Sequence, residues 1–522
     1  MTATAAHGGS NGPISAGTVS SVGRGGAVNL VGAVVYGAAN FVLVWVLNRE
    51  FGTQATGVIL IGIAMFNISL NFAQAGCSTG FIRWMSRHRA LGSHDQLRAT
   101  VIVGLGPVIA VATFLAVVVY AAAPTLAQVF SDSGQAQNVT TVFRAVAPFL
   151  PLAAVYMVVV QATRGFDTML PQAAIEKVGR ALLLPVLAWV AASAGLGSDG
   201  FARLWAATFA LALVPAGFVF LRLVNRSVAS QGVQHRRPTR RLAREYWAFT
   251  APRAVGQVSE VVVNWLDTLL IGGLVSARTA GIYNSATRYM LPGQFTADAL
   301  MQVMGSRISG LLSTDRHREA EALLRITTGW QTALTWPTYL VVIFFAPPLL
   351  EVFGADKVVA EPSVIALSVA MLAVSMVGPV QSVILMSGRS RQAMFNTLFL
   401  VAVNLTGNLL LVPRFGFNAS GFVWATTIVL ASGLPAWQSH RFLGIVANGP
   451  GSRRVAAAAL GTVGTACLAS RLVIGPSWCG LLVGGVGGAI PYTLLVWRMR
   501  EELELPALIQ GFARRKTTLE PS

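Results

Sequence analysis

The sequence has little charge and few cysteines. Only 11% of its 522 residues are Asp, Glu, Lys or Arg, whereas about 25% are charged in an average soluble domain. This shortage excludes a soluble enzyme with a short anchor, and the high apolar content excludes a disordered chain. The three cysteines, Cys77, Cys467 and Cys479, are too few and too far apart for a disulfide framework or a zinc site. We therefore expect each of them to pack as a small apolar residue.

Motifs of the common catalytic and ATP-driven proteins are also missing. The sequence has no Gly-rich phosphate loop ending in Gly-Lys-Ser or Gly-Lys-Thr, which argues against an ATPase motor in this chain. No HExxH, paired CxxC or GxSxG stands in a context that supports catalysis, and the six histidines do not cluster. We accordingly expect no catalytic residues, no bound cofactor and no metal site, and thus a protein that is not an enzyme.

Apolar length is what the sequence has in abundance. Apolar residues make up 54% of the chain, and its mean hydropathy is +0.63. Because a membrane-spanning helix needs about 20 apolar residues, the sequence predicts an all-α polytopic membrane protein with about 14 transmembrane helices. The predicted spans are 26–47, 57–80, 101–123, 143–162, 172–193, 201–221, 248–273, 281–306, 327–348, 363–386, 393–413, 419–438, 455–472 and 479–497.

The formal charge of +18 is distributed unevenly between these spans. If the N-terminus is cytoplasmic, 29 of the 38 lysines and arginines fall in cytoplasmic segments. That asymmetry follows the positive-inside rule, so we predict that both termini are cytoplasmic. A basic soluble protein would suggest a nucleic-acid partner. Here the charges border apolar spans, so we expect contacts with anionic membrane lipids and no nucleic acid.

An Arg-rich segment divides the spans into two sets of six, followed by two more. The expected parts are a flexible cytoplasmic tail at 1–22, an N-terminal six-helix lobe at 23–221, a basic cytoplasmic linker at 222–247, a C-terminal six-helix lobe at 248–441, two extra transmembrane helices at 442–498 and a cytoplasmic tail at 499–522. Residues 308–326 are typical of an amphipathic helix on the membrane surface. Two acid–base pairs at helical spacing, Glu176 with Arg180 and Glu321 with Arg325, are expected to form local ion pairs.

The seventh predicted span carries polar residues at helical spacing. Arg253, Gln257, Glu260, Asn264 and Asp267 are separated by steps of four, three, four and three, so they fall on one helical face. A helix facing lipid could not carry that face, because a charge at the bilayer centre costs several kcal/mol. Two interpretations stay open: the wall of a cavity, or a salt-bridge ladder between Arg253 and Glu260 that only joins helices.

Further polar residues follow neighbouring spans. They are Arg24 and Arg49 at the ends of span one, Asn67, Asn71 and Gln74 in span two, and Arg288 and Asp298 in span eight. If the two lobes face each other, these side chains and those of span seven can line one central cavity. Arginines bind phosphate oxygens bidentately, and buried carboxylates can take up a proton or Na⁺. We therefore predict that the arginines and amides bind the substrate and that Glu260, Asp267 and Asp298 bind a coupling ion. Each asparagine could instead bond between helices.

Four stretches carry the motifs of a known family. Residues 49–90 contain Phe51-Gly52-Thr53-Gln54-Ala55-Thr56-Gly57, and 161–186 follow the family's pattern between spans four and five. Residues 251–291 place Asp267 before Gly281-Ile282-Tyr283-Asn284-Ser285-Ala286, and residues 387–426 combine Gly388-Arg389 with Asn404 and Asn408. In these motifs the chain resembles the polysaccharide-biosynthesis flippases of the multidrug/oligosaccharidyl-lipid/polysaccharide (MOP) superfamily.

The resemblance implies two six-helix lobes that form a V around a central cavity, with two C-terminal helices appended. It implies alternating access that moves a polyprenyl-diphosphate-linked oligosaccharide from the inner to the outer leaflet. It further implies coupling to H⁺ or Na⁺, with Arg253 and Asp267 as the firmest site residues, and partners such as a polysaccharide polymerase or glycosyltransferases. The high content of Ala, Gly, Arg and Val suggests a bacterial source, so we expect the bacterial plasma membrane.

Other functions stay open at this point. A multidrug or metabolite cation antiporter of the same superfamily would use an acidic cavity, for which Glu260 and Asp267 are candidates. A lipid II flippase would need a basic cavity. A scaffold for cell-envelope assembly would tolerate loss of the cavity charges, and a membrane-embedded transferase or polymerase would need acid–base groups, for example in the outer loop 351–361.

Overall fold

A computed structural model of the chain describes residues 16–166, 168–229, 238–297, 300, 308, 311–312, 316–387 and 389–501. Within these ranges it describes side chains from residue 32 onward, except those at 90, 94, 229, 252, 255, 260, 382, 385, 386 and 390. Every element within these ranges is helical, which confirms the expected all-α fold. Eleven helical stretches among them are long and apolar enough to cross a membrane, so the chain is a multi-pass membrane protein. They match all predicted spans except 172–193, 281–306 and 327–348, and the count of fourteen stays a prediction.

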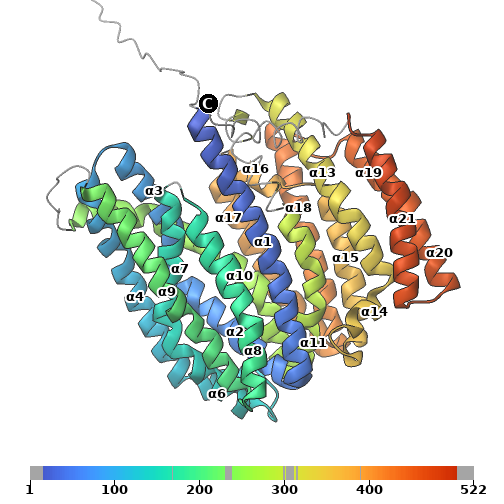
Figure 1. Cartoon of the computed structure of the whole chain (residues 1–522), viewed down its shortest axis with the longest axis horizontal. Helices are drawn as coiled ribbons and strands as arrows, with labels where there is room; N and C mark the ends of the chain where they lie inside the picture. The colour runs from blue at the N-terminus through green and yellow to red at the C-terminus, as the bar shows by residue number, and fades with distance from the viewer. Residues whose placement is uncertain are drawn as a thin grey trace, which may run out of the picture.

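The first half of the chain, blue to green in Figure 1, comprises residues 16–229. Its elements are α1 (Ala16–Glu50), α2 (Gly52–Gln74), α3 (Cys77–Ala90), η1 (His94–Gln96), α4 (Leu97–Ala121), α5 (Ala123–Phe130), α6 (Ala136–Val146), η2 (Ala147–Phe149), α7 (Leu150–Ala162), η3 (Thr163–Phe166), η4 (Gln172–Arg180), α8 (Ala181–Ser193) and α9 (Ser198–Ala229).

The second half and the appended helices follow in green to red. The second half consists of α10 (Arg240–Leu274), α11 (Ala277–Thr287), η5 (Arg288–Met290), α13 (His317–Phe344), α14 (Ala346–Glu351), η6 (Ala355–Ala360), α15 (Glu361–Ser375), α16 (Val380–Met386), α17 (Ser390–Phe415) and α18 (Asn418–Leu443). The appended helices are α19 (Pro450–Ala459), η7 (Leu460–Gly464), α20 (Thr465–Val473) and α21 (Trp478–Arg498).

Capping hydroxyl groups and residues in left-handed conformations determine where several helices begin or end. Thr239, Ser276 and Ser477 cap α10, α11 and α21, because each hydroxyl accepts a hydrogen bond from the backbone N–H three residues on. Ala75 and Gly76 adopt left-handed conformations, with φ of 46° and 77°, and so end α2. The chain then turns directly into α3.

Helices extend beyond the predicted spans into the segments before and between them. Helix α1 begins at Ala16, inside the predicted tail 1–22, and α9 and α10 together cover most of the predicted linker 222–247. Residues 317–326 of the predicted surface helix form the first turns of the long α13. Most of the remainder of that segment lies outside the described residues, as do residues 502–522 of the predicted C-terminal tail.

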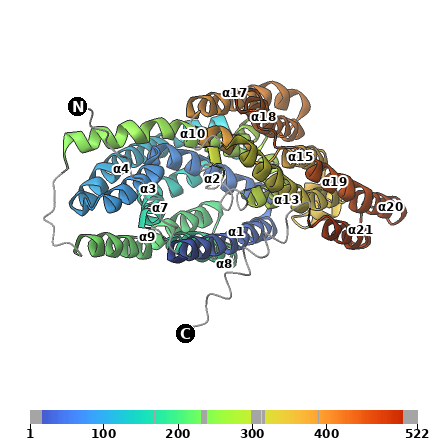
Figure 2. The same ribbon diagram turned by 90° about the horizontal axis from the view of Figure 1, so that it is seen from above.

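The two halves lie side by side. In Figure 2 helices α1–α9 occupy one side of the molecule, α13–α18 the other, and α19–α21 the far edge. Helix α2 of the first half packs extensively against α10 and α11, which begin the second half. We call the end of the molecule at which α13 and α19 begin the arginine-rich end (top of Figure 1), because Arg316 directly precedes α13 and Arg453 lies in the first turn of α19, and we call the end at which α1 finishes the opposite end.

Candidate functional site

Asp267 of α10 is a buried acid with neutral partners. Only 3% of the residue is exposed. One carboxylate oxygen accepts a hydrogen bond from the hydroxyl of Tyr283 in α11 (3.0 Å), and the other accepts one from Nδ2 of Asn408 in α17 (2.9 Å). The ion pairs found among the described residues do not include Asp267. Because a buried carboxylate without a counter-charge is costly, this group can hold a proton or a small cation.

The amides beside Asp267 leave polar atoms without partners. Asn408 also donates Nδ2 to the backbone oxygen of Asn404 (2.9 Å), and both side chains are fully buried. Within the described part of the chain, Oδ1 of Asn408 and Nδ2 of Asn404 have no hydrogen-bond partner. Carboxylate and amide oxygens are the ligands that a hard cation prefers. Asp267 and the amide oxygen of Asn408 are therefore the residues that could hold Na⁺, and Asp267 alone could hold a proton.

We call Asp267, Tyr283, Asn404 and Asn408 the acid cluster, and Arg288 is linked through Asn284 to Thr268, which follows Asp267 in the chain. The Asn284 amide donates to Oγ1 of Thr268 (3.4 Å), and its oxygen accepts a hydrogen bond from Nη2 of Arg288. The Nε of Arg288 is buried and has no partner within the described ranges. Arg288 is only half-buried as a residue, so it keeps hydrogen-bonding capacity for a further anionic group.

Arg253 lies at the arginine-rich end and shares an aromatic ring with Arg83. Its guanidinium is 3.7 Å from the ring centroid of Phe249, and that of Arg83 in α3 is 3.8 Å from the same centroid. Both arginines are exposed. Two guanidinium groups held on one ring form a fixed double positive charge that suits a diphosphate. Arg83 is not among the predicted site residues, and the aromatic Phe249, one turn before Arg253, is the sequence signal for this contact.

The residues of the predicted polar face of α10 do not share one environment in the structure. Asn264 is exposed and Gln257 is half-buried, whereas Asp267 is buried between α11 and α17. The side chain of Glu260 lies outside the described side chains, so the predicted ladder with Arg253 stays a prediction. Asp298 and the side chain of Arg24 also lie outside the described part.

The remaining predicted residues are not brought to Asp267. Asn67 and Asn71 donate their amides to backbone oxygens of their own helix, both at 2.9 Å, and Gln74 accepts a hydrogen bond from Ser78. Arg49 is exposed at the opposite end, with its guanidinium 5.2 Å from the ring of Trp45. The bonds of Asn67 and Asn71 lie within α2 and that of Gln74 reaches the adjacent α3, so the assignment of these residues to the substrate stays a prediction.

The expected pair of Glu176 and Arg180 is confirmed. Two nitrogens of Arg180 lie 3.0 Å from the carboxylate oxygens of Glu176, and Tyr156 donates to the same carboxylate at 2.7 Å. The guanidinium also lies 4.0 Å from the ring centroid of Phe209. The ion pair is therefore held in place within the first half by Tyr156 and Phe209.

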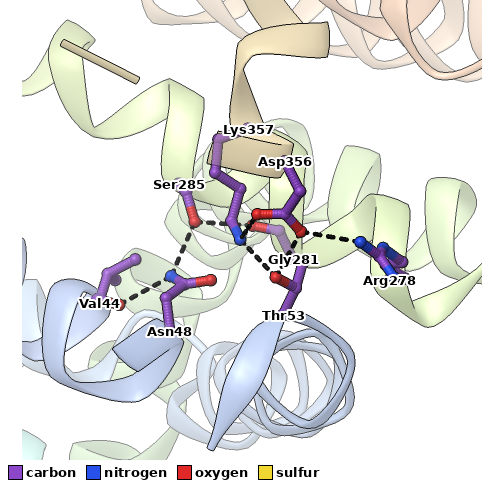
Figure 3. A network of polar contacts seen from close by, with 8 residues as sticks. All are labelled: Val44, Asn48, Thr53, Arg278, Gly281, Ser285, Asp356 and Lys357. Atoms are coloured by element: carbon purple, nitrogen blue, oxygen red, sulfur yellow. Dashed lines mark hydrogen bonds and ion pairs between the residues drawn. The ribbon is translucent and has the colours of Figure 1, made fainter. Parts of the chain in front are cut away.

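A polar network joins the two halves at the opposite end (Figure 3). Thr53 of α2 donates to Asp356 of η6 (2.6 Å) and accepts from the ammonium group of Lys357 (2.5 Å). Asp356 also binds Lys357 (2.9 Å) and Arg278 of α11 (3.1 Å). We call the set Asn48, Thr53, Arg278, Ser285, Asp356 and Lys357 the seam, because Asn48 of α1 likewise donates to Ser285 of α11 (3.0 Å).

Glycines bring the backbones together beside the seam. A Cβ atom at Gly57 of α2 would lie 1.7 Å from the carbonyl oxygen of Ala277, and one at Gly281 of α11 would lie 2.7 Å from that of Thr53. Neither position tolerates a side chain without backbone movement. As in other small-residue helix contacts, the glycines let the two backbones touch. The halves are thus fitted closely at the opposite end.

Loss of the Lys357 charge is expected to loosen the seam. Lys357 is 1% exposed, and its removal leaves Asp356 with one fewer cation and Thr53 with an unused acceptor. We expect Lys357→Met to speed amide hydrogen exchange at the start of α2 and in η6 about tenfold. Hydrogen exchange read by mass spectrometry measures this. The control is Arg203→Met, which removes an exposed cation 4.0 Å from Asp199, and unchanged exchange in Lys357→Met would contradict the assignment of Lys357 to the seam.

Comparisons with known proteins agree with this architecture. A family model described as polysaccharide biosynthesis protein matches residues 46–361. Agl15 of Haloferax volcanii, described as a probable low-salt glycan biosynthesis flippase, is 21% identical over 218 residues. That match covers 40% of this chain and 45% of the archaeal protein, so the chain matches less than half of that relative's length.

Solved structures share the fold at low sequence identity. The lipid II flippase MurJ in an inward closed conformation has a TM-score of 0.72 and 11% identity, and the match covers 91% of this chain and 98% of MurJ. An inward-facing multidrug resistance MATE family transporter of the MOP superfamily has a TM-score of 0.64 and 12% identity, covering 79% of this chain and 94% of that one. These likenesses establish the two-lobed fold that the resemblance implied.

Proposed function

The chain belongs to the polysaccharide biosynthesis protein family of the MOP superfamily, and we propose that it is a flippase for a polyprenyl-diphosphate-linked oligosaccharide. It moves the lipid-linked glycan from the cytoplasmic to the outer leaflet by alternating access and is not an enzyme. The name of the archaeal relative, a glycan biosynthesis flippase, supports this substrate class.

The observation that carries the proposal is the pair of charged sites on α10. The exposed guanidinium groups of Arg253 and Arg83 meet at the arginine-rich end, and the buried carboxylate of Asp267 lies 14 residues further along the same helix. At 1.5 Å per residue the two sites are about 21 Å apart. Binding of a diphosphate at one site and of a cation at the other can therefore act on one rigid element.

We further propose that the arginine-rich end is cytoplasmic and that the membrane is the bacterial plasma membrane. The substrate diphosphate meets Arg83 and Arg253 from the inner leaflet, and Arg288 receives it closer to the acid cluster. The seam keeps the opposite, outer end closed during loading and parts to release the glycan. Asp267 binds H⁺ or Na⁺ and supplies the coupling. A polymerase or glycosyltransferases of the same pathway supply and consume the lipid-linked glycan.

The test is a deletion in the native host, complemented with wild type or with Arg83→Ala/Arg253→Ala. Lipid-linked sugars are extracted, and their leaflet is read with an impermeant glycan-modifying enzyme on spheroplasts. We expect the deletion to accumulate glycan that the enzyme cannot reach. The double variant should restore outward movement at least tenfold less well than wild type, because each lost arginine removes charge-assisted hydrogen bonds.

The matched control is Arg241→Ala/Arg244→Ala, which removes two exposed arginines from the same helix. It should complement like wild type. Full complementation by Arg83→Ala/Arg253→Ala, at equal membrane abundance, would contradict the proposed diphosphate site. An unchanged lipid-linked pool in the deletion strain would contradict the proposed substrate.

A second candidate, a multidrug or metabolite cation antiporter, is favoured by one observation, the buried carboxylate of Asp267, which forms no ion pair with the residues that the structure describes. It predicts altered sensitivity to toxic cations in the deletion strain, with normal lipid-linked pools. A lipid II flippase predicts that the accumulating species is the peptidoglycan precursor. The same extraction therefore separates the three functions.

A further inference from the structure

A basic pocket lies away from the seam and from Asp267, at the arginine-rich end where α18 leads into the appended helices. It measures about 470 Å³ and is lined by Arg325 of α13, by Val446, Asn448 and Gly449 of the connecting segment, and by Pro450, Arg453 and Arg454 of α19. All three arginines are at least partly exposed, and Arg325 has 43% of its side chain exposed. The three guanidinium groups thus face one solvent-accessible space.

The connecting segment is held in place by the same residues. Glu321 accepts hydrogen bonds from Arg325 (2.6 Å) and from the backbone N–H of Val446 (3.3 Å), and Arg325 donates to the carbonyl of Val446 (3.1 Å). Arg453 donates Nε to Asn448 (3.2 Å). The pocket therefore has a fixed wall, to which the ion pair of Arg325 with Glu321 contributes.

An apolar pocket of about 290 Å³ adjoins the basic one. Its lining includes Val377, Ala436 and Ala447, and it shares Val446 and Asn448 with the basic pocket. A soluble anion would use only the basic part. A molecule with an anionic head and an apolar body would fill both.

The depth of the site in the bilayer points to the same ligand. Arg453 and Arg454 lie in the first turns of α19, at the start of the membrane-spanning stretch Pro450–Val473. Arginines at the end of a spanning helix lie at the level of lipid headgroups. Basic pockets between helices at this level recognise lipid phosphates.

We propose that the two adjoining pockets bind one anionic phospholipid of the leaflet at the arginine-rich end, with its phosphate on Arg453, Arg454 and Arg325 and its glycerol-ester region against Val377 and Ala436. The lipid fastens the appended helices to the second half. This site is independent of the proposed transport path, since none of its residues belongs to the seam or to the acid cluster.

The test measures binding of palmitoyl-oleoyl phosphatidylglycerol to the purified full-length protein by native mass spectrometry, with palmitoyl-oleoyl phosphatidylcholine as the neutral comparison. We expect the Kd for phosphatidylglycerol to rise at least about tenfold in Arg453→Gln/Arg454→Gln, because charge-assisted hydrogen bonds to the phosphate are lost. Arg453→Lys/Arg454→Lys should keep most of the affinity. The matched control, Arg222→Gln/Arg226→Gln, removes two exposed arginines at the arginine-rich end of α9 and should bind like wild type.

Three results would overturn the proposal. Equal losses of affinity in Arg453→Gln/Arg454→Gln and Arg222→Gln/Arg226→Gln would show general attraction to the basic surface. Equal binding of both lipids would show that the pocket does not distinguish an anionic headgroup from a net-neutral one. Full displacement of phosphatidylglycerol by inorganic phosphate would assign the pocket to a soluble anion. Ala436→Phe keeps every arginine and fills the apolar pocket. It should weaken phosphatidylglycerol binding without changing that of inorganic phosphate, and it decides the question if the Gln double fails to fold.

Discussion

Asp267→Asn is expected to abolish the dependence of transport on an ion gradient while leaving the protein folded. The variant keeps the shape of the side chain and an oxygen that can accept from Tyr283 or Asn408, so the local hydrogen bonds can persist. It removes the negative charge that a coupling cation or proton needs. A buried charge without a counter-charge is itself costly, so we expect an unchanged or raised Tm.

The size of the effect follows from the driving force. One elementary charge moved across 100 mV carries about 2.3 kcal/mol, which corresponds to an accumulation ratio of about 40. We expect an imposed Na⁺ or H⁺ gradient to stimulate substrate movement in proteoliposomes by up to this factor for wild type. Asp267→Asn should show no stimulation by either gradient.

Two comparisons make the test of Asp267 specific. Asp199→Asn removes an exposed carboxylate of the first half and should keep the full response. Asn408→Leu keeps the acid but removes the orphaned oxygen next to it, so it should weaken a response to Na⁺ more than one to H⁺. Persistent stimulation in Asp267→Asn would move the coupling site elsewhere, for example to Glu260 or Asp298.

The helical fold was predictable because it depends on periodicity and apolar length. Eleven predicted spans coincide with helices long and apolar enough to cross a membrane, because a run of about 20 apolar residues has few alternatives in a bilayer. Of the other three, 327–348 lies mostly in the unbroken helix α13, whereas 172–193 and 281–306 carry charged residues. Gln172–Arg180 forms a π-helix that carries the Glu176–Arg180 pair.

The candidate site was less predictable because its contacts join residues far apart in sequence. The spacing of Arg253 and Asp267 predicted one face, but burial of Asp267 depends on Tyr283 and Asn408, which other helices bring to it. Lys357 lies between two predicted spans, and its burial against Thr53 of α2 is a contact 304 residues apart in sequence. Helical periodicity shows which residues of one helix share a face, but it carries no information on which other helix lies opposite that face.

Gly57→Ala is expected to force the seam open. The added Cβ would lie 1.7 Å from a backbone oxygen, and ordinary contacts need 3.5–4.0 Å, so α2 and α11 must separate by about 2 Å. Backbone cannot rotate away as a side chain can. We expect a longer distance between spin labels at Gln54→Cys and Val359→Cys, measured by double electron–electron resonance after Cys77, Cys467 and Cys479 are replaced by alanine. Both label sites are exposed.

A graded series distinguishes steric opening from general damage. In Gly281→Ala the added Cβ would lie 2.7 Å from the carbonyl oxygen of Thr53. This variant should therefore lengthen the distance between the spin labels less than Gly57→Ala does. Gly217→Ala lies in open space in α9 and should leave the distance unchanged, while helix propensity adds about 0.5–1 kcal/mol of stability. If closure of this end belongs to the transport cycle, transport must fall in the same order, by at least tenfold for Gly57→Ala. Transport that stays normal with an opened seam would show that closure at this end is structural and that the substrate leaves by another route.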